Sequence, residues 1–150
     1  MKKFLLLIAV AFMAVSVNAQ SWGIGIKGGA DYGLNIKKYN GGNNLEAVID
    51  FHSHGFRLTG LYEWDQELGS GFHLYYGFGA NLGLWERWVE EHHDGDAEFG
   101  LGISGVLGIE WHLPNNIPLT LAVDWTPSFE LIPETGFWWK GIAGSIKYVF

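Results

Sequence analysis

Apolar and polar residues alternate along most of the chain, which is the pattern of β-strands with two different faces. Over 99–113, the large apolar residues share one face, while glycines and small or polar residues take most of the other. Because successive side chains of a strand point to opposite sides, an alternation of this length predicts a strand with one apolar face. Segments 72–84, 119–125 and 142–150 repeat the pattern.

The first half of the chain alternates less regularly, at 22–27, 34–37, 45–52 and 56–65. Together the segments predict eight strands, although residues 21–39 could form one long strand and leave seven. Glycine, proline, asparagine and charged residues cluster between the segments and predict the breaks. The breaks are expected at 28–29, 40–44, 54–55, 68–71, 86–98, 114–118 and 133–136.

The apolar faces are very large for the core of a soluble chain of 150 residues, and the opposite faces are rich in glycine. Strands of about ten residues that are apolar outside and polar inside are typical of membrane barrels. A soluble sandwich or a lipocalin-like barrel would place the aromatic face inside instead. After the N-terminal segment, no apolar stretch approaches the roughly 20 residues that a transmembrane helix needs. The sequence therefore predicts an all-β fold, an eight-stranded antiparallel up-and-down transmembrane β-barrel.

The N-terminus predicts export. A positively charged start precedes an apolar run over 4–15, and residues 17–19 approximate the small-residue cleavage pattern of a secretory signal peptide. We expect a cleaved signal peptide over 1–19 and an outer-membrane barrel over 20–150. An uncleaved membrane anchor is the alternative.

Composition narrows the function classes. The chain carries 9 Lys and Arg against 16 Asp and Glu, whereas binding to a nucleic-acid backbone needs clustered cations. Hydrophobic residues make up 48% of the chain, which excludes intrinsic disorder. The chain has no cysteine, which excludes disulfides, thiolate metal sites and a cysteine nucleophile. We therefore expect no nucleic-acid partner and no cofactor.

The C-terminal segment resembles a known assembly signal. Residues 141–150 alternate in polarity and end in an aromatic residue. This pattern resembles the C-terminal recognition signal of outer-membrane barrels, which the barrel-assembly machinery reads. The resemblance implies that Tyr148 and Phe150 serve as the assembly signal.

Segments 56–64, 74–80, 105–111 and 117–127 resemble the small outer-membrane β-barrel domain proteins that are common in the Bacteroidetes. The resemblance implies an outer-membrane location in a Gram-negative cell, with both termini in the periplasm and no general catalytic motif. It implies outer-membrane lipid, lipopolysaccharide and the assembly machinery as partners, and an envelope protein partner is a further expectation. The implied periplasmic turns are 40–44, 66–71 and 114–118, and the implied outer loops are 28–31, 53–55, 86–98 and 133–138.

The predicted inward face carries many charges. An eight-stranded barrel is filled by its own side chains, and buried charges are very costly unless they are paired. We expect a salt-bridge network that plugs the lumen, with a proton- or ion-conducting path as the alternative. The expected network consists of Lys27, Lys37, Glu46, Asp50, Arg57, Glu63, Glu110, Asp124 and Lys147.

Most tryptophans fall near the ends of predicted strands. Trp and Tyr gather at both membrane interfaces and form the aromatic girdles of membrane barrels. Trp138 and Trp139, in a predicted outer loop, could instead form a platform for a sugar. The expected girdle residues are Trp22, Trp64, Trp85, Trp111, Trp125 and Tyr148.

Two polar clusters suggest chemistry without completing a motif. The loop 86–98 could hold a divalent ion, but its spacing matches no ligand motif. His52, Ser53 and His54 suggest a hydrolase, but neighbours on a strand point to opposite faces, so His52 does not face Ser53. The His-x-Ser-Asn pattern of barrel-shaped lipid A deacylases is absent as well. We predict no catalytic, cofactor-binding or metal site.

The sequence therefore predicts a non-enzymatic outer-membrane barrel with a structural or surface-interaction role in the cell envelope. A surface-binding module whose outer loops engage a glycan, lipopolysaccharide or a protein is the alternative. A lipid-modifying barrel enzyme is the third possibility.

Overall fold

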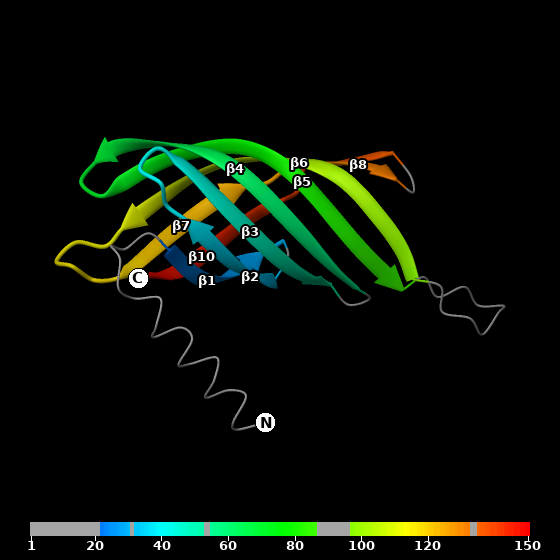
Figure 1. The fold of residues 1–150 in the computed structure, drawn as a ribbon, viewed down its shortest axis with the longest axis horizontal. Helices are drawn as coiled ribbons and strands as arrows, with labels where there is room; N and C mark the ends of the chain where they lie inside the picture. The colour runs from blue at the N-terminus through cyan, green and yellow to red at the C-terminus, as the bar shows by residue number, and fades with distance from the viewer. Residues whose placement is uncertain (1–21, 31, 53–54, 87–96, 133–134) are drawn as a thin grey trace, which may run out of the picture.

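The computed structural model describes residues 22–30, 32–52, 55–86, 97–132 and 135–150. The regular secondary structure of these residues consists of β-strands (Figure 1). The strands are β1 (Trp22–Gly29), β2 (Tyr32–Lys38), β3 (Asn43–His52), β4 (Gly55–Gly69), β5 (Phe72–Glu86), β6 (Ala97–His112), β7 (Leu119–Trp125), β8 (Ser128–Ile132), β9 (Gly136–Trp138) and β10 (Ile142–Val149). None of the described residues forms a helix that is long and apolar enough to cross a membrane.

The described strands close into a barrel. Consecutive strands pair antiparallel from β1 to β7, and β1 also pairs with β10, which leaves no open edge there. Both β7 and β8 pair with β6. β8 continues β7 along β6 in the same register, because Leu107 pairs with Trp125 and Ser104 pairs with Ser128. β9 pairs with β8 as β10 pairs with β7, so β9 and β10 share the last position. The predicted all-β, eight-stranded antiparallel barrel is confirmed.

The first hairpin decides between seven and eight strands. Ile26 of β1 pairs with Leu34 of β2, so the chain reverses between these strands. The prediction of two strands within 21–39 is confirmed, and one long strand is wrong.

The last two barrel strands are interrupted, which the sequence analysis did not predict. Proline has no N–H for the sheet ladder, so the pairing breaks at Pro127, whose carbonyl still accepts a hydrogen bond from the Gly105 amide at 2.9 Å. The last strand breaks at 139–141, where the Gly141 carbonyl accepts a hydrogen bond from the Thr126 amide at 2.8 Å. The predicted outer loop 133–138 is wrong in part, because 136–138 form β9.

Several strands extend into the predicted turns and loops. Gly69, Ser70 and Gly71 have φ values of 99°, 57° and 83°, so the turn between β4 and β5 is tight and 66–69 stay in β4. Glycine and polar residues at the end of a barrel can still form main-chain hydrogen bonds with the neighbouring strand, although their side chains do not alternate in polarity. Each of the predicted turns and loops 28–31, 40–44, 53–55, 66–71 and 86–98 therefore includes residues that belong to strands. The predicted turn 114–118 is confirmed.

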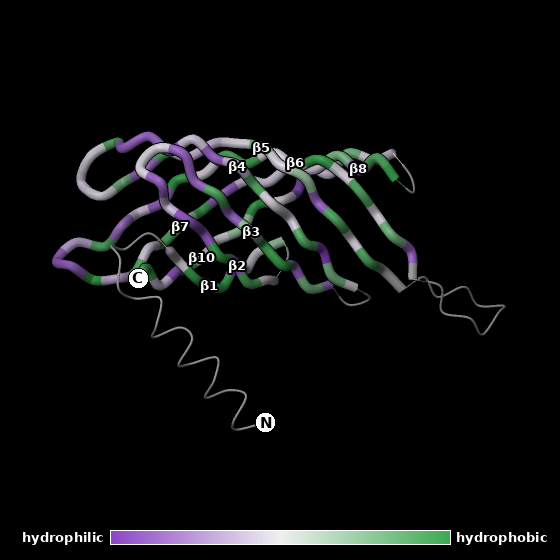
Figure 2. Tube along the Cα trace, viewed as in Figure 1, coloured by the Kyte–Doolittle hydropathy of each residue, from purple (hydrophilic) through white to green (hydrophobic). Residues whose placement is uncertain are grey.

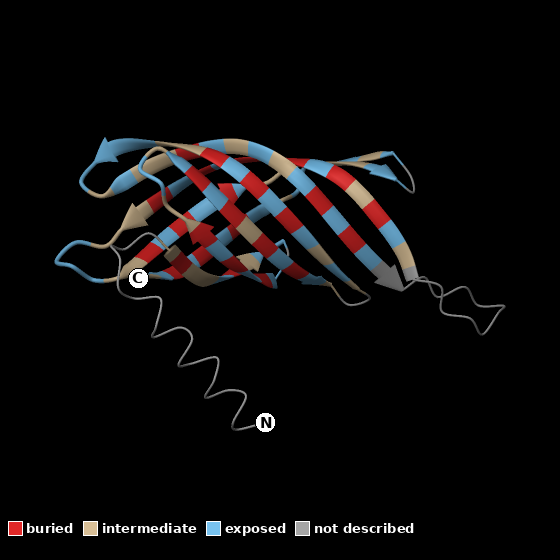
Figure 3. Cartoon of the chain, viewed as in Figure 1, coloured by how far each residue is buried: buried red, intermediate tan, exposed pale blue. Residues whose placement is uncertain are grey.

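The two faces of the wall are opposite in polarity. Large apolar side chains cover the outside, such as Ile26, Phe78 and Val123, each at least 60% exposed. Most of the buried side chains are polar or charged, and they point into the lumen. Figure 2 shows the alternating hydropathy along the strands, and Figure 3 shows buried and exposed positions alternating in the same way. The aromatic face therefore lies outside, opposite to the arrangement of a lipocalin-like barrel.

The barrel has two distinct ends. The turns β2–β3, β4–β5 and β6–β7 lie at one end, which we call the turn end. Trp22 and Phe150 also meet there, since their main chains exchange two hydrogen bonds of 3.1 and 2.8 Å. The strands β1, β3, β5 and β8 end at the opposite side of the barrel, which we call the loop end (Figure 1).

Candidate functional site: the charged lumen

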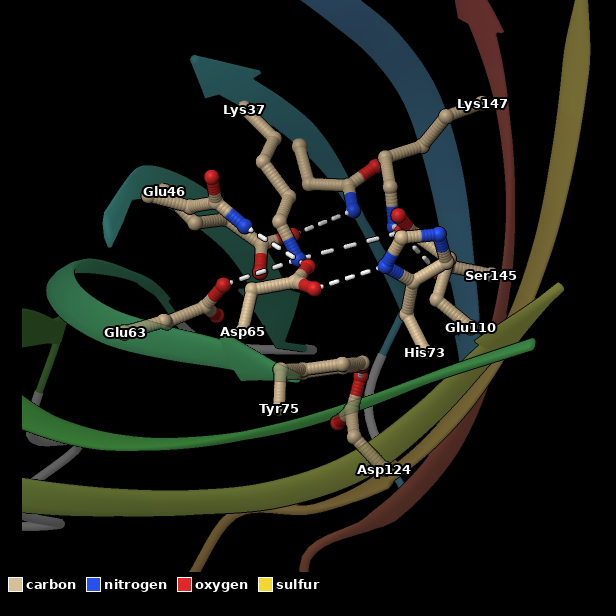
Figure 4. A network of polar contacts seen from close by, with 12 residues as sticks. Lys37, Glu46, Glu63, Asp65, His73, Tyr75, Glu110, Asp124, Ser145 and Lys147 are labelled. Carbon is tan, nitrogen blue, oxygen red and sulfur yellow. Dashed lines mark hydrogen bonds and ion pairs between the residues drawn. The ribbon is translucent and has the colours of Figure 1, made fainter. Parts of the chain in front are cut away.

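A cluster of four charged side chains crosses the lumen towards the turn end. Lys37 Nζ lies 2.8 Å from Glu63 Oε2 and 3.8 Å from Glu110 Oε2, and Lys147 Nζ lies 2.7 Å from the same Glu110 oxygen. All four side chains are at most 1% exposed. Figure 4 shows them pointing towards one another, and we call Lys37, Glu63, Glu110 and Lys147 the turn-end cluster.

The partners in this cluster come from strands that are not neighbours in the wall. Lys37 is on β2, Glu63 on β4, Glu110 on β6 and Lys147 on β10. Each occupies an inward position of its strand's alternation, and its ion-pair partner in the cluster reaches into the lumen from a different strand. The three ion pairs therefore tie the wall together across the lumen, in addition to the hydrogen bonds between adjacent strands.

A further ion pair lies between the turn-end cluster and the loop end. Lys27 Nζ on β1 lies 2.6 Å from Asp124 Oδ1 on β7, again across an intervening strand. The Tyr75 hydroxyl on β5 donates to the other Asp124 oxygen at 2.9 Å, and the Thr126 hydroxyl donates to Oδ1 at 3.0 Å. The Asp124 carboxylate is thereby hydrogen-bonded on both oxygens, which is what a buried charge requires.

Tyr75 links the two charged groups and was not singled out by the sequence analysis. Its side chain is fully buried, and Lys37 Nζ lies 3.9 Å from the centre of its ring, within cation–π range. Gly108 makes room for this ring, because a Cβ there would lie 2.5 Å from Tyr75 Cζ and 2.7 Å from Asp124 Cβ. The sequence did contain a signal for Tyr75. Its position in the alternation is inward, whereas most large aromatic residues of a membrane barrel face the lipid.

Glu46 borders the turn-end cluster, where its carboxylate meets that of Glu63, and Asp50 and Arg57 lie farther from the cluster. Glu46 accepts a hydrogen bond of 2.6 Å from Asn35 on the adjacent strand. Asp50 and Arg57 are directly opposite each other on β3 and β4, nearer the loop end. The structure thus places all nine predicted residues on the inward face, in groups that follow one another from the turn end towards the loop end.

Histidines at the turn end were also missed by the sequence analysis. His73 Nδ1 lies 2.7 Å from Asp65 Oδ1, and His112 Nε2 lies 3.0 Å from Glu110 Oε1. The two imidazole rings are 4.5 Å apart. Burial and the nearby Glu110 carboxylate raise the pKa of Tyr39 well above its usual value, so its hydroxyl keeps its proton. These groups lie between the turn-end cluster and the turn end of the barrel.

Two cavities lie above the turn-end cluster. One is inside the lumen beside Lys27 and Asp50 and has a volume of about 30 Å³. The other opens at the loop end and has a volume of about 560 Å³. Arg57 borders both, and Glu130, Trp138 and Lys140 border the larger one, which we call the mouth cavity.

Four of the predicted girdle residues lie near the turn end. Trp22 begins β1, Trp111 is next to the last residue of β6, and Tyr148 is close to the end of β10. Trp64 stacks on Tyr76 with ring centres 5.9 Å apart. The other stacked pairs there are Phe72 with Trp111 and Tyr148 with Phe150.

Trp125 is placed differently. Its indole Nε1 donates to the Trp139 carbonyl at 2.6 Å, where β7 ends and the last strand is interrupted. The side chain of Trp85 is outside the described part of the chain. Residues 53–54 and 87–96 are outside it as well, so the divalent-ion and hydrolase hypotheses keep the status of sequence-based predictions.

Comparisons with known proteins identify the fold. No family model and no curated protein sequence matches the chain. Among solved structures, the barrel is similar to the N-terminal β-barrel domain of Pseudomonas aeruginosa OprF, with a TM-score of 0.65 and 12% sequence identity. The match covers 86% of this chain and 95% of the OprF chain. The resemblance to Bacteroidetes-type barrels stays a prediction, and the fold of this chain is that of the solved OprF barrel domain.

Proposed function

We propose that the chain is a non-enzymatic outer-membrane β-barrel with a structural or surface-interaction role in the cell envelope. The observation that carries the proposal is the inverted polarity of the wall, with apolar side chains outside and charged side chains inside. Apolar patches exposed to water are rarely larger than a few hundred Å² on soluble proteins, and this belt surrounds the barrel. A closed barrel satisfies its main-chain hydrogen bonds without water, as a membrane requires.

The proposed orientation places the turn end in the periplasm and the loop end outside the cell. Trp22 and Phe150 meet at the turn end, and the resemblance implies that both termini lie in the periplasm. The stacked aromatic pairs near this end match the expected position of a girdle at the inner interface. Tyr148 and Phe150 lie on the terminal strand that we expect the barrel-assembly machinery to recognise.

We further propose that the turn-end cluster and the Lys27–Asp124 pair plug the lumen. Their ion pairs cross the barrel between strands that are not adjacent, so they occupy its cross-section. The lumen cavity beside Lys27 has a volume of about 30 Å³, small beside the mouth cavity of about 560 Å³. A barrel plugged in this way contributes to the envelope through its wall and its loop end.

Heat-dependent mobility on a denaturing gel tests the barrel in the membrane. The unboiled protein from the outer-membrane fraction is expected to migrate differently from the boiled protein, because a closed barrel leaves no strand edge for detergent to attack. The boiled sample of the same fraction is the control. A protein found in the soluble periplasm without a mobility shift would contradict the proposal.

Conductance tests the plug. Purified barrel in liposomes is expected to give no stable single-channel steps above the background of empty liposomes, because charged side chains fill the lumen. A Lys37→Ala/Glu63→Ala double variant that keeps its heat-dependent mobility shows what an opened lumen conducts. Stable steps from the unchanged protein would exclude the plug and favour an ion-conducting path.

A surface-binding role is a second candidate, and the mouth cavity is the observation that favours it. The cavity of about 560 Å³ is within the range of small-molecule sites and opens at the end proposed to face outward. Its lining combines charged residues with an aromatic ring, as binding sites for polar ligands do.

A further inference from the structure

The wall of the barrel has unequal height at the loop end. β4, β5 and β6 have 15, 15 and 16 residues, whereas β1 and β2 have 8 and 7. At the loop end β5 and β6 extend beyond the first hairpin, and the β8–β9 hairpin extends with them (Figure 1). The lumen consequently opens along a slanted rim, and the mouth cavity lies within it.

The strands beside the mouth cavity are irregular. β7 and β8 are separated at 126–127, β9 and β10 are separated at 139–141, and the pairing of β6 with β8 shifts register after Leu101. Thr126, Lys140 and Gly141 from these breaks line the cavity. Bulges and breaks at barrel rims turn side chains towards a site, and here they turn them towards a hollow of about 560 Å³.

The chemistry of the lining favours an anionic ligand with hydroxyl groups. Arg57 and Lys140 contribute two cations against one carboxylate, Glu130, although the whole chain carries only 9 cationic residues against 16 acidic ones. Arg57 and Lys140 can donate to a carboxylate or phosphate, and Glu130 and Ser128 can bond hydroxyl groups. Trp138 is 60% exposed and offers an apolar ring surface beside these polar groups.

We propose that the mouth cavity binds a sugar that carries one carboxylate or phosphate group. Lys140 and Arg57 hold the anionic group, Glu130 and Ser128 bond the ring hydroxyls, and Trp138 covers the apolar face of the ring. This inference deepens the surface-binding role and rests on it, since the loop end must face outward to meet such a ligand. The anionic sugar could be a free solute or the head group of lipopolysaccharide, which share this chemistry.

Calorimetric titration of the full chain, folded in detergent micelles, tests the proposal. The probes are glucose 6-phosphate, glucuronate, glucose and purified lipopolysaccharide. Glucose 6-phosphate or glucuronate is expected to bind about tenfold more tightly than glucose, because only they can form charge-assisted hydrogen bonds with the cations. Binding of lipopolysaccharide but of neither free anionic sugar would assign the site to the lipid head group.

Matched variants locate the binding site. Lys140→Gln is expected to weaken binding of the anionic probe about tenfold, whereas Lys38→Gln makes the same charge change at the turn end and is expected to have no effect. Trp138→Ala is expected to weaken binding by several-fold, whereas the equally exposed Phe137 does not line the cavity and can be replaced without effect. Lys140 is the cation chosen for replacement, because Arg57 also lies directly opposite Asp50 on the adjacent strand and its replacement would alter the barrel wall as well.

Three results would overturn the inference. The first is no binding of any probe by a protein that keeps its heat-dependent mobility, which would leave the membrane barrel intact and remove the sugar site. The second is equal affinity for glucose and glucose 6-phosphate. The third is an equal loss of affinity in the Lys140→Gln and Lys38→Gln variants.

Discussion

Replacing Glu110 with glutamine is expected to lower the free energy of unfolding by about 3–5 kcal/mol, the usual cost of breaking a buried ion pair from one side. Glu110 Oε2 lies 2.7 Å from Lys147 Nζ and 3.8 Å from Lys37 Nζ. Both lysine side chains are at most 1% exposed. The neutral amide would leave their charges buried with less compensation, so the folded state loses stability while the unfolded state does not.

The midpoint of urea unfolding, followed by tryptophan fluorescence in lipid vesicles, measures this loss. Glu67→Gln is the matched control, because Glu67 is exposed near the end of β4 and the chemical change is the same. A Glu110→Met/Lys147→Met double variant is expected to recover part of the stability, since apolar pairs can replace buried ion pairs at little cost. A loss for Glu110→Gln no larger than for Glu67→Gln would mean that water reaches the cluster and screens its charges.

The positions of the lumen charges could be predicted from the sequence, but their partners could not. A strand has a side-chain period of two, so one correct face assignment places every charge of that strand inside or outside. Partner choice depends on which strands face each other across the closed lumen. Lys27 and Asp124 are 97 positions apart in the chain, and their pairing follows only from closure of β1 onto β10.

The rim of the barrel was harder to predict than its middle. Glycines and polar residues at the loop end were predicted to break the strands. Gly28, Gly29 and Gly55 nevertheless belong to strands, because a neighbouring strand forms main-chain hydrogen bonds with them. Pro127 interrupts a strand that continues in the same register on its other side, which a local pattern does not reveal. The mouth cavity depends on these irregularities, so the sequence analysis found its tryptophan but not the cavity.

Replacing Gly79 with alanine is expected to have the largest effect of a single added methyl group. Gly79 on β5 pairs with Leu61 on β4, and a Cβ at Gly79 would overlap the carbonyl oxygen of Gly60 and lie 2.9 Å from Leu61 Cα. Main-chain atoms cannot turn away as a side chain can, so β4 and β5 would have to separate. We expect a loss of more than about 3 kcal/mol or no closed barrel at all, beyond the usual cost of overpacking.

The matched control lies on the strand next to it. Gly60→Ala adds the same methyl group, but a Cβ there points outward and has no heavy atom within 4 Å. It is expected to change the unfolding midpoint little, so the two variants separate strand packing from the general effect of replacing a glycine in a strand. The heat-dependent mobility of the unboiled protein reports closure directly. A Gly79→Ala protein with the same mobility shift and urea midpoint as Gly60→Ala would mean that the two strands do not approach each other so closely, and the narrow cross-section that the lumen charges fill would have to be wider.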